Sequence, residues 1–479
     1  MQTVLSLLHG FLNPFTCSFS TPSPTPRQIM RPLPDLPLEI WLEIFQFATY
    51  VQQHATIVPL DPFTPKRVSN NVMGINTPSL STRTKLSLVL VCRSWRAVAV
   101  QMLYDYVVIR SPARANALLA VLLNSAQISS TNRHTPSYGQ WTRHIEIYTH
   151  ARGADELRFL QTLFRIFQLC PKLRMLSGTW IHSLPTEFLD AISKLYGPSL
   201  QGMYWNDRSI TMLPPSTTLE HAPNFLGSFK SLRVLDLRGY WGHTFSILKS
   251  SPPMLPRLQD LILSTSPRSL QAATALVLPS LRNLTLKTSV AGTEDMLVQF
   301  LKVHGSSLTS IDLPSPAADS DPEPDTSQLR RTAFHLNPDI FLQDDLCPNL
   351  ETLTFPTTSP PLSPDIKHPL RRIGLRGVRA DGLYPDKETG TKVHLMSFTS
   401  SHYPNLEVIR TIGFLVEADT DSLIKDIFIW WVEKFEKQGV DFLDGEGVLW
   451  AYSDDEACRA EDATIFCPGR AAEEKKVEY

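Results

Sequence analysis

Cysteines and clustered carboxylates are the residues of this sequence that could hold a metal ion or act as nucleophiles. Six cysteines stand far apart and form no Cys-x-x-Cys pair: Cys17, Cys92, Cys170, Cys347, Cys458 and Cys467. Near the last two, Asp454, Asp455 and Glu456 form an acidic cluster. A structural metal site takes Cys or His ligands at close, regular spacing, and no histidine stands at such a spacing here. We interpret the cluster as a solvated turn and expect no metal and no other cofactor.

Motifs for catalysis are absent from the sequence. There is no Gly-x-Ser-x-Gly, no glycine-rich phosphate loop and no His-Glu-x-x-His, the patterns that position a nucleophile, a nucleotide or a zinc ion. Cys170 and Cys347 both occur in Leu-Cys-Pro segments, which indicates repeat packing rather than a nucleophile. Asn283 and Thr285 form a glycosylation acceptor inside a predicted strand, and we take it as a chance match. The sequence predicts a protein that is not an enzyme and has no catalytic residue.

The charges of the chain nearly cancel. It has 45 Lys and Arg against 47 Asp and Glu, a formal net charge of −2, so no global basic field would attract nucleic acid or anionic lipid. No Lys or Arg precedes Arg27, and no apolar run reaches the roughly 18 residues of a membrane helix. We predict a cytoplasmic or nuclear protein with no nucleic-acid partner and no membrane partner.

One short phrase recurs from about residue 140 onward. It reads Leu-x-x-apolar-x-apolar and often follows a proline, as in the segment that begins at Pro256. Successive first leucines are 27, 32, 26, 23, 27, 42, 20 and 36 residues apart, and most of these spacings lie near the period of a solenoid. These leucines are Leu173, Leu200, Leu232, Leu258, Leu281, Leu308, Leu350, Leu370 and Leu406.

The end of each phrase predicts a β-strand. Its last two apolar residues lie two positions apart and therefore point to one face of a strand, as do Leu235 and Leu237. Amphipathic segments such as 157–167 and 296–301 lie between phrases and predict helices. A repeated strand and helix buries its faces only against neighbouring repeats. The predicted fold class is α/β, an irregular leucine-rich-repeat solenoid with parallel strands and with helices on the outer side.

A helical block precedes the repeats. Pro37 and Glu39 suit the first turn of a helix, where a missing N–H and a negative charge are both favourable. Two apolar stripes follow at helical spacing, one of Ile40, Ile44, Phe47, Ala48 and Val51 and one of Trp41 and Phe45. Further helical patterns cover 86–92 and 95–103. Three short helices cannot bury so many apolar side chains, so the surplus face is expected to meet a partner protein.

This block resembles the F-box. The residues that carry the likeness are Leu36, Pro37, Glu39, Ile40, Ile44 and Phe45, followed by Val91, Cys92, Trp95 and Arg96. The resemblance implies a Skp-type adaptor as partner, which links F-box proteins to a cullin complex. It assigns adaptor binding to Leu36, Pro37, Glu39, Ile40, Ile44, Phe45, Leu90, Val91 and Trp95. For Trp95, a place in the domain's own core is an equally open reading.

The sequence departs from the two family patterns in two places. A long polar insertion at 52–83 separates the halves of the F-box motif, similar to the expanded F-boxes of large fungal families. The repeats also lack the asparagine that usually follows each strand, because Arg238 follows Leu237 and Ser264 follows Leu263. We therefore expect a solenoid of uneven curvature.

Strand residues that point away from the leucine core would select a target protein. They form a mixed polar surface, which suits a protein partner. The candidates are Val234, Asp236, Arg238, Asp260, Asn283, Lys287, Arg372 and Arg376, with Ile262, Thr285, Asp312 and Thr352 on the same face. A merely solvated face is the alternative for any one of them. Arg371, Arg372 and Arg376 form a basic spot suited to an anion.

The chain divides into five predicted segments. Residues 1–31 form a flexible leader, 32–110 the F-box with its insertion, and 111–418 the solenoid, with loop insertions at 314–328 and 356–369. Residues 419–466 form a capping helix and a hairpin around Asp444, and 467–479 form a flexible tail.

Two functions of different classes fit these segments. The first is a substrate-recognition subunit of an SCF-type cullin ubiquitin ligase, which holds a target for ubiquitin-dependent degradation. The alternative is a protein-interaction scaffold without a ligase role. An enzyme with its active site on the repeat surface is a third reading, and no motif supports it.

Overall fold

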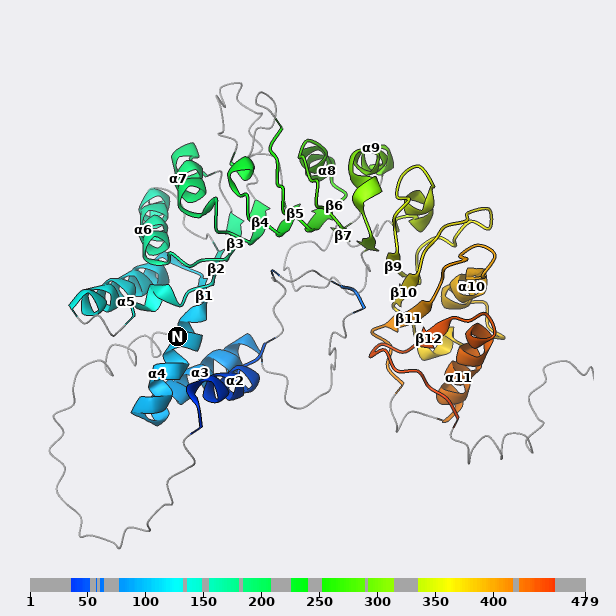
Figure 1. Ribbon diagram of the computed structural model, residues 1–479, viewed down its shortest axis with the longest axis horizontal. Coiled ribbons are helices and arrows are strands. Elements are labelled where there is room, and N and C mark those ends of the chain that lie inside the picture. The colour runs from blue at the N-terminus through cyan, green and yellow to red at the C-terminus, as the bar shows by residue number, and fades with distance from the viewer. Residues whose placement is uncertain are drawn as a thin grey trace, which may run out of the picture.

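The fold is given by a computed structural model. It describes residues 36–51, 57, 61–63, 77–131, 136–148, 155–180, 184–207, 225–239, 252–288, 292–313, 335–416 and 422–452. The predicted leader, the predicted tail, the loop at 314–328 and the acidic cluster at 454–456 lie outside the described residues. Figure 1 shows an arch of repeats with a helical head at its N-terminal end.

The head contains three helices: α2 (Leu38–Ala48), α3 (Pro78–Val91) and α4 (Arg93–Asp105). Thr77 caps α3, because its side chain accepts a hydrogen bond from the Leu80 N–H, and Pro78 occupies the first position. Cys92 separates α3 from α4 in extended backbone, and its sulfur accepts a hydrogen bond from the Trp95 N–H. Capping of this kind satisfies N–H groups that a helix start leaves without partners.

Within the described residues, twelve strands form one sheet in chain order, and each pairs in parallel with its sequence neighbours. The strands are β1 (Tyr106–Ile109), β2 (His144–Tyr148), β3 (Met175–Trp180), β4 (Gly202–Asp207), β5 (Val234–Gly239), β6 (Asp260–Ser264), β7 (Asn283–Thr288), β8 (Ser310–Asp312), β9 (Thr352–Pro356), β10 (Arg372–Arg376), β11 (Val408–Ile412) and β12 (Asp441–Leu443). This order confirms the predicted α/β solenoid of parallel strands.

The strand register builds an unbroken apolar ladder behind the sheet. One buried side chain from each of the strands β2 to β12 joins it: Ile145, Leu176, Met203, Leu235, Leu261, Leu284, Ile311, Leu353, Ile373, Ile409 and Phe442. The nine first leucines of the phrases, from Leu173 to Leu406, are also all buried. The repeated phrase therefore marks the core of the solenoid, as predicted.

A ladder of backbone carbonyls joins each repeat to the next at the start of the strands. The carbonyl of Arg174, for example, accepts hydrogen bonds from the N–H groups of Gln201 (2.8 Å) and Gly202 (3.0 Å). The same double acceptance recurs at Arg143, Gln201, Arg233, Gln259, Arg282, Thr309, Glu351 and Arg371. Main-chain groups thus connect successive repeats without the asparagine of a regular leucine-rich repeat.

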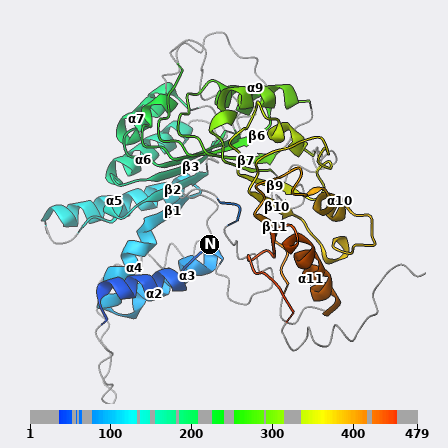
Figure 2. The same cartoon turned by 45° about the vertical axis from the view of Figure 1, so that its right-hand side comes forward.

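Helices lie on the outer side of the arch, as expected, and both views show the sheet on the inner side (Figures 1 and 2). They are α5 (Pro112–Thr131), α6 (Asp155–Leu169), α7 (Thr186–Tyr196), α8 (Pro267–Thr274), α9 (Glu294–His304), α10 (Gly390–Ser397) and α11 (Ser422–Glu436), with short 3₁₀ turns at Tyr138–Gln140, Leu226–Ser228, Gly305–Ser307, Pro338–Leu342 and Ala380–Gly382. Every helix of the described residues is too short or too polar to cross a membrane.

The two Leu-Cys-Pro segments share one packing arrangement. Gly139 lies against the carbonyl of Leu169, and Gly305 lies against the carbonyl of Leu346. A Cβ atom at Gly305 would stand 2.2 Å from that oxygen, so only glycine fits. Cys170 and Cys347 follow these carbonyls and are both buried. Repeat packing therefore accounts for both thiols, and burial raises the pKa of Cys170 to about 11.

The ends of the solenoid differ from the predicted segments. The sheet begins with β1 at Tyr106, inside the span assigned to the head. At the other end, α11 and β12 are present, but residues 448–450 form no second strand. The Asp444 carboxylate instead closes a turn, because it accepts hydrogen bonds from the N–H groups of Glu446 and Val448, both 2.9 Å, and from the Trp450 indole at 3.0 Å.

Candidate interaction surfaces

Three aromatic rings form the centre of the head. The ring centroids of Trp41 and Trp95 are 5.0 Å apart, and that of Phe45 lies 4.9 Å from Trp95. Val98 and Met102 of α4 complete this small core. Phe45 is buried and Trp95 is half-buried, so the structure places these two predicted adaptor-binding residues in the interior of the head.

Polar contacts fix α3 relative to the rest of the head. The Ser81 hydroxyl donates a buried hydrogen bond of 2.6 Å to the carbonyl of Thr49, which directly follows α2. Lys85 is partly buried, which lowers its pKa, and the negative charge of Asp105 opposes that shift. Burial in turn raises the pKa of Asp105. α3 is thus tied to the end of α2 by a hydrogen bond and lies near the charge at the end of α4.

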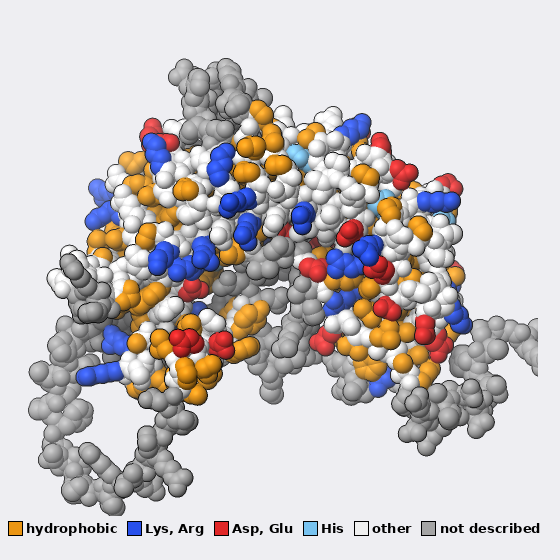
Figure 3. All heavy atoms as spheres, in the orientation of Figure 1, with side chains coloured by type: hydrophobic (Ala, Val, Ile, Leu, Met, Phe, Trp, Pro, Cys, Tyr) orange, Lys and Arg blue, Asp and Glu red, His pale blue; other side chains and the backbone are white. Residues whose placement is uncertain are grey.

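The other predicted adaptor-binding residues lie on the surface of the head. Exposed positions are Leu36, Pro37, Glu39, Ile40 and Ile44 at the start and along α2, and Leu90 and Val91 at the end of α3. Phe47 extends the α2 stripe with 81% of its side chain exposed. Of the twenty large hydrophobic side chains that are exposed among the described residues, nine lie between residues 36 and 91. Figure 3 shows hydrophobic side chains gathered over this part of the molecule.

The predicted target-binding residues belong to the inner strands of the arch but differ in accessibility. Val234, Asp236 and Asp260 are buried, Asn283, Lys287, Arg372 and Arg376 are half-buried, and Arg238 is exposed. Of the further residues on this face, Ile262, Thr285 and Thr352 are buried and Asp312 is half-buried. This part of the sheet therefore offers few fully open side chains.

Carboxylates and amides pair along this face. Arg238 contacts Asp236 at 3.0 Å, and the Asn283 amide donates to Asp260 at 2.7 Å. Burial raises the pKa of Asp236, while the charge of Arg238 opposes the rise. The predicted basic spot is also paired with carboxylates: Arg371 with Glu407 at 2.6 Å, Arg372 with Asp61 at 3.6 Å and Arg376 with Asp312 at 2.8 Å.

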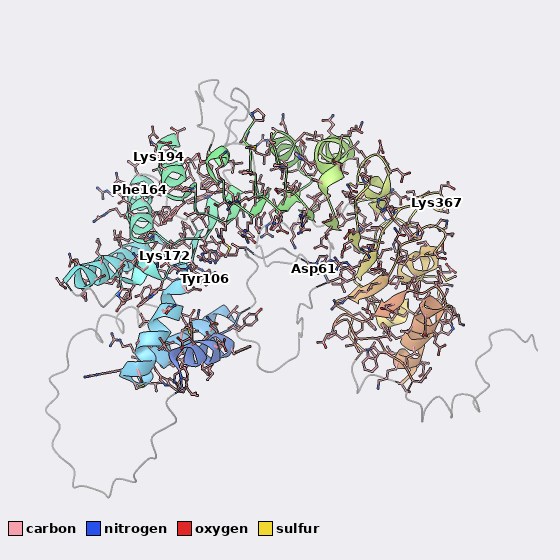
Figure 4. All side chains as sticks on the ribbon, in the orientation of Figure 1. Asp61, Tyr106, Phe164, Lys172, Lys194 and Lys367 are labelled. Atoms are coloured by element: carbon pink, nitrogen blue, oxygen red, sulfur yellow. The ribbon has the colours of Figure 1, made fainter. Side chains whose placement is uncertain are left out.

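A polar cluster lies at the N-terminal end of the sheet, where Figure 4 labels Tyr106. The hydroxyls of Tyr106 and Tyr148 both donate to the Glu146 carboxylate. The His144 ring lies 2.8 Å from the Ser177 hydroxyl, measured from Nε2 to Oγ. Burial lowers the pKa of His144 to about 3, so the ring is neutral at physiological pH and is held as part of the scaffold.

Sequence reasoning missed one feature of this face, which is the chain between α2 and α3. Ile57 packs against the cluster of Met175, Tyr204, Val234 and Ile262 on the inner strands. Phe63 is buried against the C-terminal strands, and Figure 4 labels Asp61 beside them. The polar composition of the insertion gave no signal for these contacts, because its apolar residues follow no helical or strand period.

Among the described residues, no group of three or more His, Cys, Asp or Glu side chains could hold a metal ion. The surfaces described above offer apolar contact, charge pairing and main-chain hydrogen bonds. Such groups are suited to contact with another polypeptide.

Comparison with known proteins adds little to this geometry. No family model matches the chain, and no curated protein matches it. Among solved structures, it is similar to a chain of the crystal structure of the Rad7 and Elc1 complex in yeast. The two are 12% identical, the match covers 73% of this chain and 96% of that chain, and the TM-score is 0.20. A similarity this weak supports no inference about fold or function.

Proposed function

We propose that this protein is the substrate-recognition subunit of an SCF-type cullin ubiquitin ligase. The head binds a Skp-type adaptor, and the repeats bind a target protein. The protein catalyses no reaction itself; it raises the effective concentration of the target near a ubiquitin-charged enzyme.

The observation that carries the proposal is the division of α2 into two apolar faces. Trp41 and Phe45 pack into the head, whereas Ile40, Ile44 and Phe47 on the other face are exposed. Residues three and four apart share one face of a helix, so these side chains form a single stripe. An exposed apolar stripe on so small a domain is typical of a protein interface, and two of its residues, Ile40 and Ile44, belong to the part that resembles the F-box.

Co-purification with a Skp-type adaptor tests the proposal. We expect the full chain to retain the adaptor and the variant Ile40→Asp/Leu90→Asp to lose it. Both side chains are exposed and lie outside the core of the head, so the variant should still fold. Ile128→Asp is a matched control, since Ile128 is also exposed but lies on α5. Equal recovery of adaptor by wild type and by the folded double variant would contradict the proposal.

Target turnover in cells separates the ligase role from the scaffold alternative. Deletion of the whole head span 32–110 would also remove β1 from the sheet, so the double point variant is the better tool. Slower turnover of a bound target in the variant supports the ligase role. Unchanged turnover, with target binding intact, favours the scaffold.

A further inference from the structure

The chain between α2 and α3 occupies the inner face of the arch at two points. At the first point, Ile57 lies over Gly202, where a Cβ atom would stand 3.0 Å from the Ile57 Cγ2. The absence of a side chain at Gly202 leaves the space, and Met175 and Val234 border it on the neighbouring strands. Ile57 therefore fills an apolar recess on the sheet.

The second point lies at β10 and β11. Asp61 accepts a hydrogen bond from the Phe63 N–H at 2.9 Å, which forms a compact turn around Pro62. The Phe63 ring lies under the Arg372 guanidinium, 5.1 Å from ring centroid to Cζ, and the Asp61 carboxylate is 3.6 Å from the same guanidinium. The Phe63 carbonyl accepts a hydrogen bond from Arg410 Nη1. Arg372 and Arg410 together thus contact one acidic side chain, one aromatic ring and one main-chain carbonyl.

The repeats orient both arginines independently of this segment. Arg372 Nε donates to the Thr352 hydroxyl at 3.0 Å on β9. Arg410 Nε donates to the Asp444 carbonyl at 3.2 Å, and Nη2 donates to the Gly445 carbonyl. Gly447, at φ +85°, lies against the Arg410 guanidinium, where a Cβ atom would be 3.4 Å from Cζ. Arg372 is therefore held by β9 and Arg410 by the turn after β12, and the Nη1 group of each points toward residues 61–63.

The contacts of the segment are suited to exchange. The Asp61 and Arg372 side chains are 45% and 38% exposed, and an ion pair so exposed contributes at most about 1 kcal/mol. Arg410, in contrast, is buried, and its side chain donates hydrogen bonds to the main-chain carbonyls of Phe63, Asp444 and Gly445. A main-chain carbonyl is available from any extended polypeptide, so another segment with the same side chains could replace Asp61–Phe63.

We propose that this site on β10 and β11 binds a target segment with a carboxylate two residues before an aromatic side chain, and that Asp61 and Phe63 occupy it in cis until the target displaces them. The inference rests on the proposed function only in taking the repeats as the target-binding part. The ligand is an extended protein segment, and Arg372 and Arg410 are the residues that select it.

Fluorescence anisotropy with a labelled peptide tests the site. The probe is residues 55–65 of this chain, and the protein is the full chain, either wild type or with Asp61→Ser/Phe63→Ala to empty the site. A tethered segment has an effective concentration of about 1 mM, so a probe with a dissociation constant of about 10 µM should bind the wild type about 100-fold more weakly than the emptied variant. A probe with Asp61→Asn and Phe63→Ala should not bind.

Arginine variants on the emptied background complete the test. Arg372→Gln should weaken probe binding at least about tenfold, because it removes the cation–π contact and the ion pair together. Arg371→Gln is the matched control, since Arg371 pairs with Glu407 instead. Arg372 is substituted rather than Arg410, because Arg410 also donates to the carbonyls of the turn at Asp444. Absence of probe binding by the folded emptied variant, or equal binding by its Arg372→Gln form, would overturn the proposal. No adaptor is present in this assay, so a failed adaptor test leaves its result unchanged.

Discussion

The Ile57 side chain occupies the space that the missing side chain of Gly202 leaves on the sheet. Ile57 belongs to the chain that joins the head helices, and Gly202 begins β4 in the solenoid. A Cβ atom at Gly202 would lie 3.0 Å from Ile57 Cγ2 and 3.2 Å from Met175 Cγ. The close fit ties Ile57 to β3 and β4 of the sheet.

Substitution of Gly202 should loosen that segment. In Gly202→Val the added methyl groups press on Ile57, and loss of this contact should cost about 1 kcal/mol. Such a loss raises the locally open population about fivefold. Chymotrypsin cleavage after Phe63 should speed up by this factor, because the protease must take the Phe63 ring, which is buried. Ile57→Ala should give the same change without altering the sheet; an unchanged cleavage rate in both variants would refute the contact.

Gly305 should tolerate no side chain. A Cβ atom added at Gly305 would lie 2.2 Å from the Leu346 carbonyl oxygen. The backbone of the next repeat must therefore move in Gly305→Ala. Overpacking of this kind typically costs about 1–3 kcal/mol. Denaturant unfolding measures the loss. Ser306→Ala, an exposed position in the same turn, is the control and should stay within about 0.5 kcal/mol of wild type.

The Asp312–Arg376 pair should contribute more than a surface ion pair. Arg376 donates from Nε and Nη2 to Asp312 at 2.8–3.1 Å, and the side chains are only 16% and 14% exposed. A double-mutant cycle with Asp312→Asn and Arg376→Met should give a coupling energy of about 1–2 kcal/mol, because desolvation strengthens the pair. The exposed Asp190–Lys194 pair should give less than about 0.5 kcal/mol. Equal coupling energies would show that burial adds nothing here.

Acid should destabilise the fold in part through His144. Burial lowers its pKa from 6.5 to about 3, so between these values the unfolded chain binds a proton that the folded chain does not. Stability is therefore lost as pH falls from 6.5 toward 3. At pH 5 the loss from this one group is about 2 kcal/mol. The free energy of unfolding of His144→Gln, measured from pH 7 to pH 5, should fall correspondingly less than that of wild type; parallel curves would exclude a role for His144.

The repeat body was largely predictable because its pattern is local. A leucine followed by two apolar residues at alternate positions predicts a strand and shows which of its side chains face the core. Each such leucine is buried. The two stripes of α2 follow from the helical period in the same way. The start of the sheet at Tyr106 was missed, because β1 carries no repeat phrase before it.

The contacts on the inner face could not be predicted from the pattern. Alternation along a strand places Asp236 and Asp260 away from the leucine core, but it does not say that neighbouring side chains bury them. Phe63 and Arg410 stand 347 residues apart, and no local signal connects them. Such pairs depend on the curvature of the whole solenoid, which arises from the sum of all repeats.

The contacts of Ile57 and Phe63 with the inner face also limit how far the arch can open. From Ile57 to Phe63 the chain advances six residues, which span at most about 21 Å. The strands that they contact, β4–β5 and β10–β11, are about six strand spacings apart, or about 29 Å along the sheet. The segment is thus a chord shorter than its arc, and the solenoid cannot flatten while both ends are held. Release of either end would let the N-terminal and C-terminal repeats move farther apart.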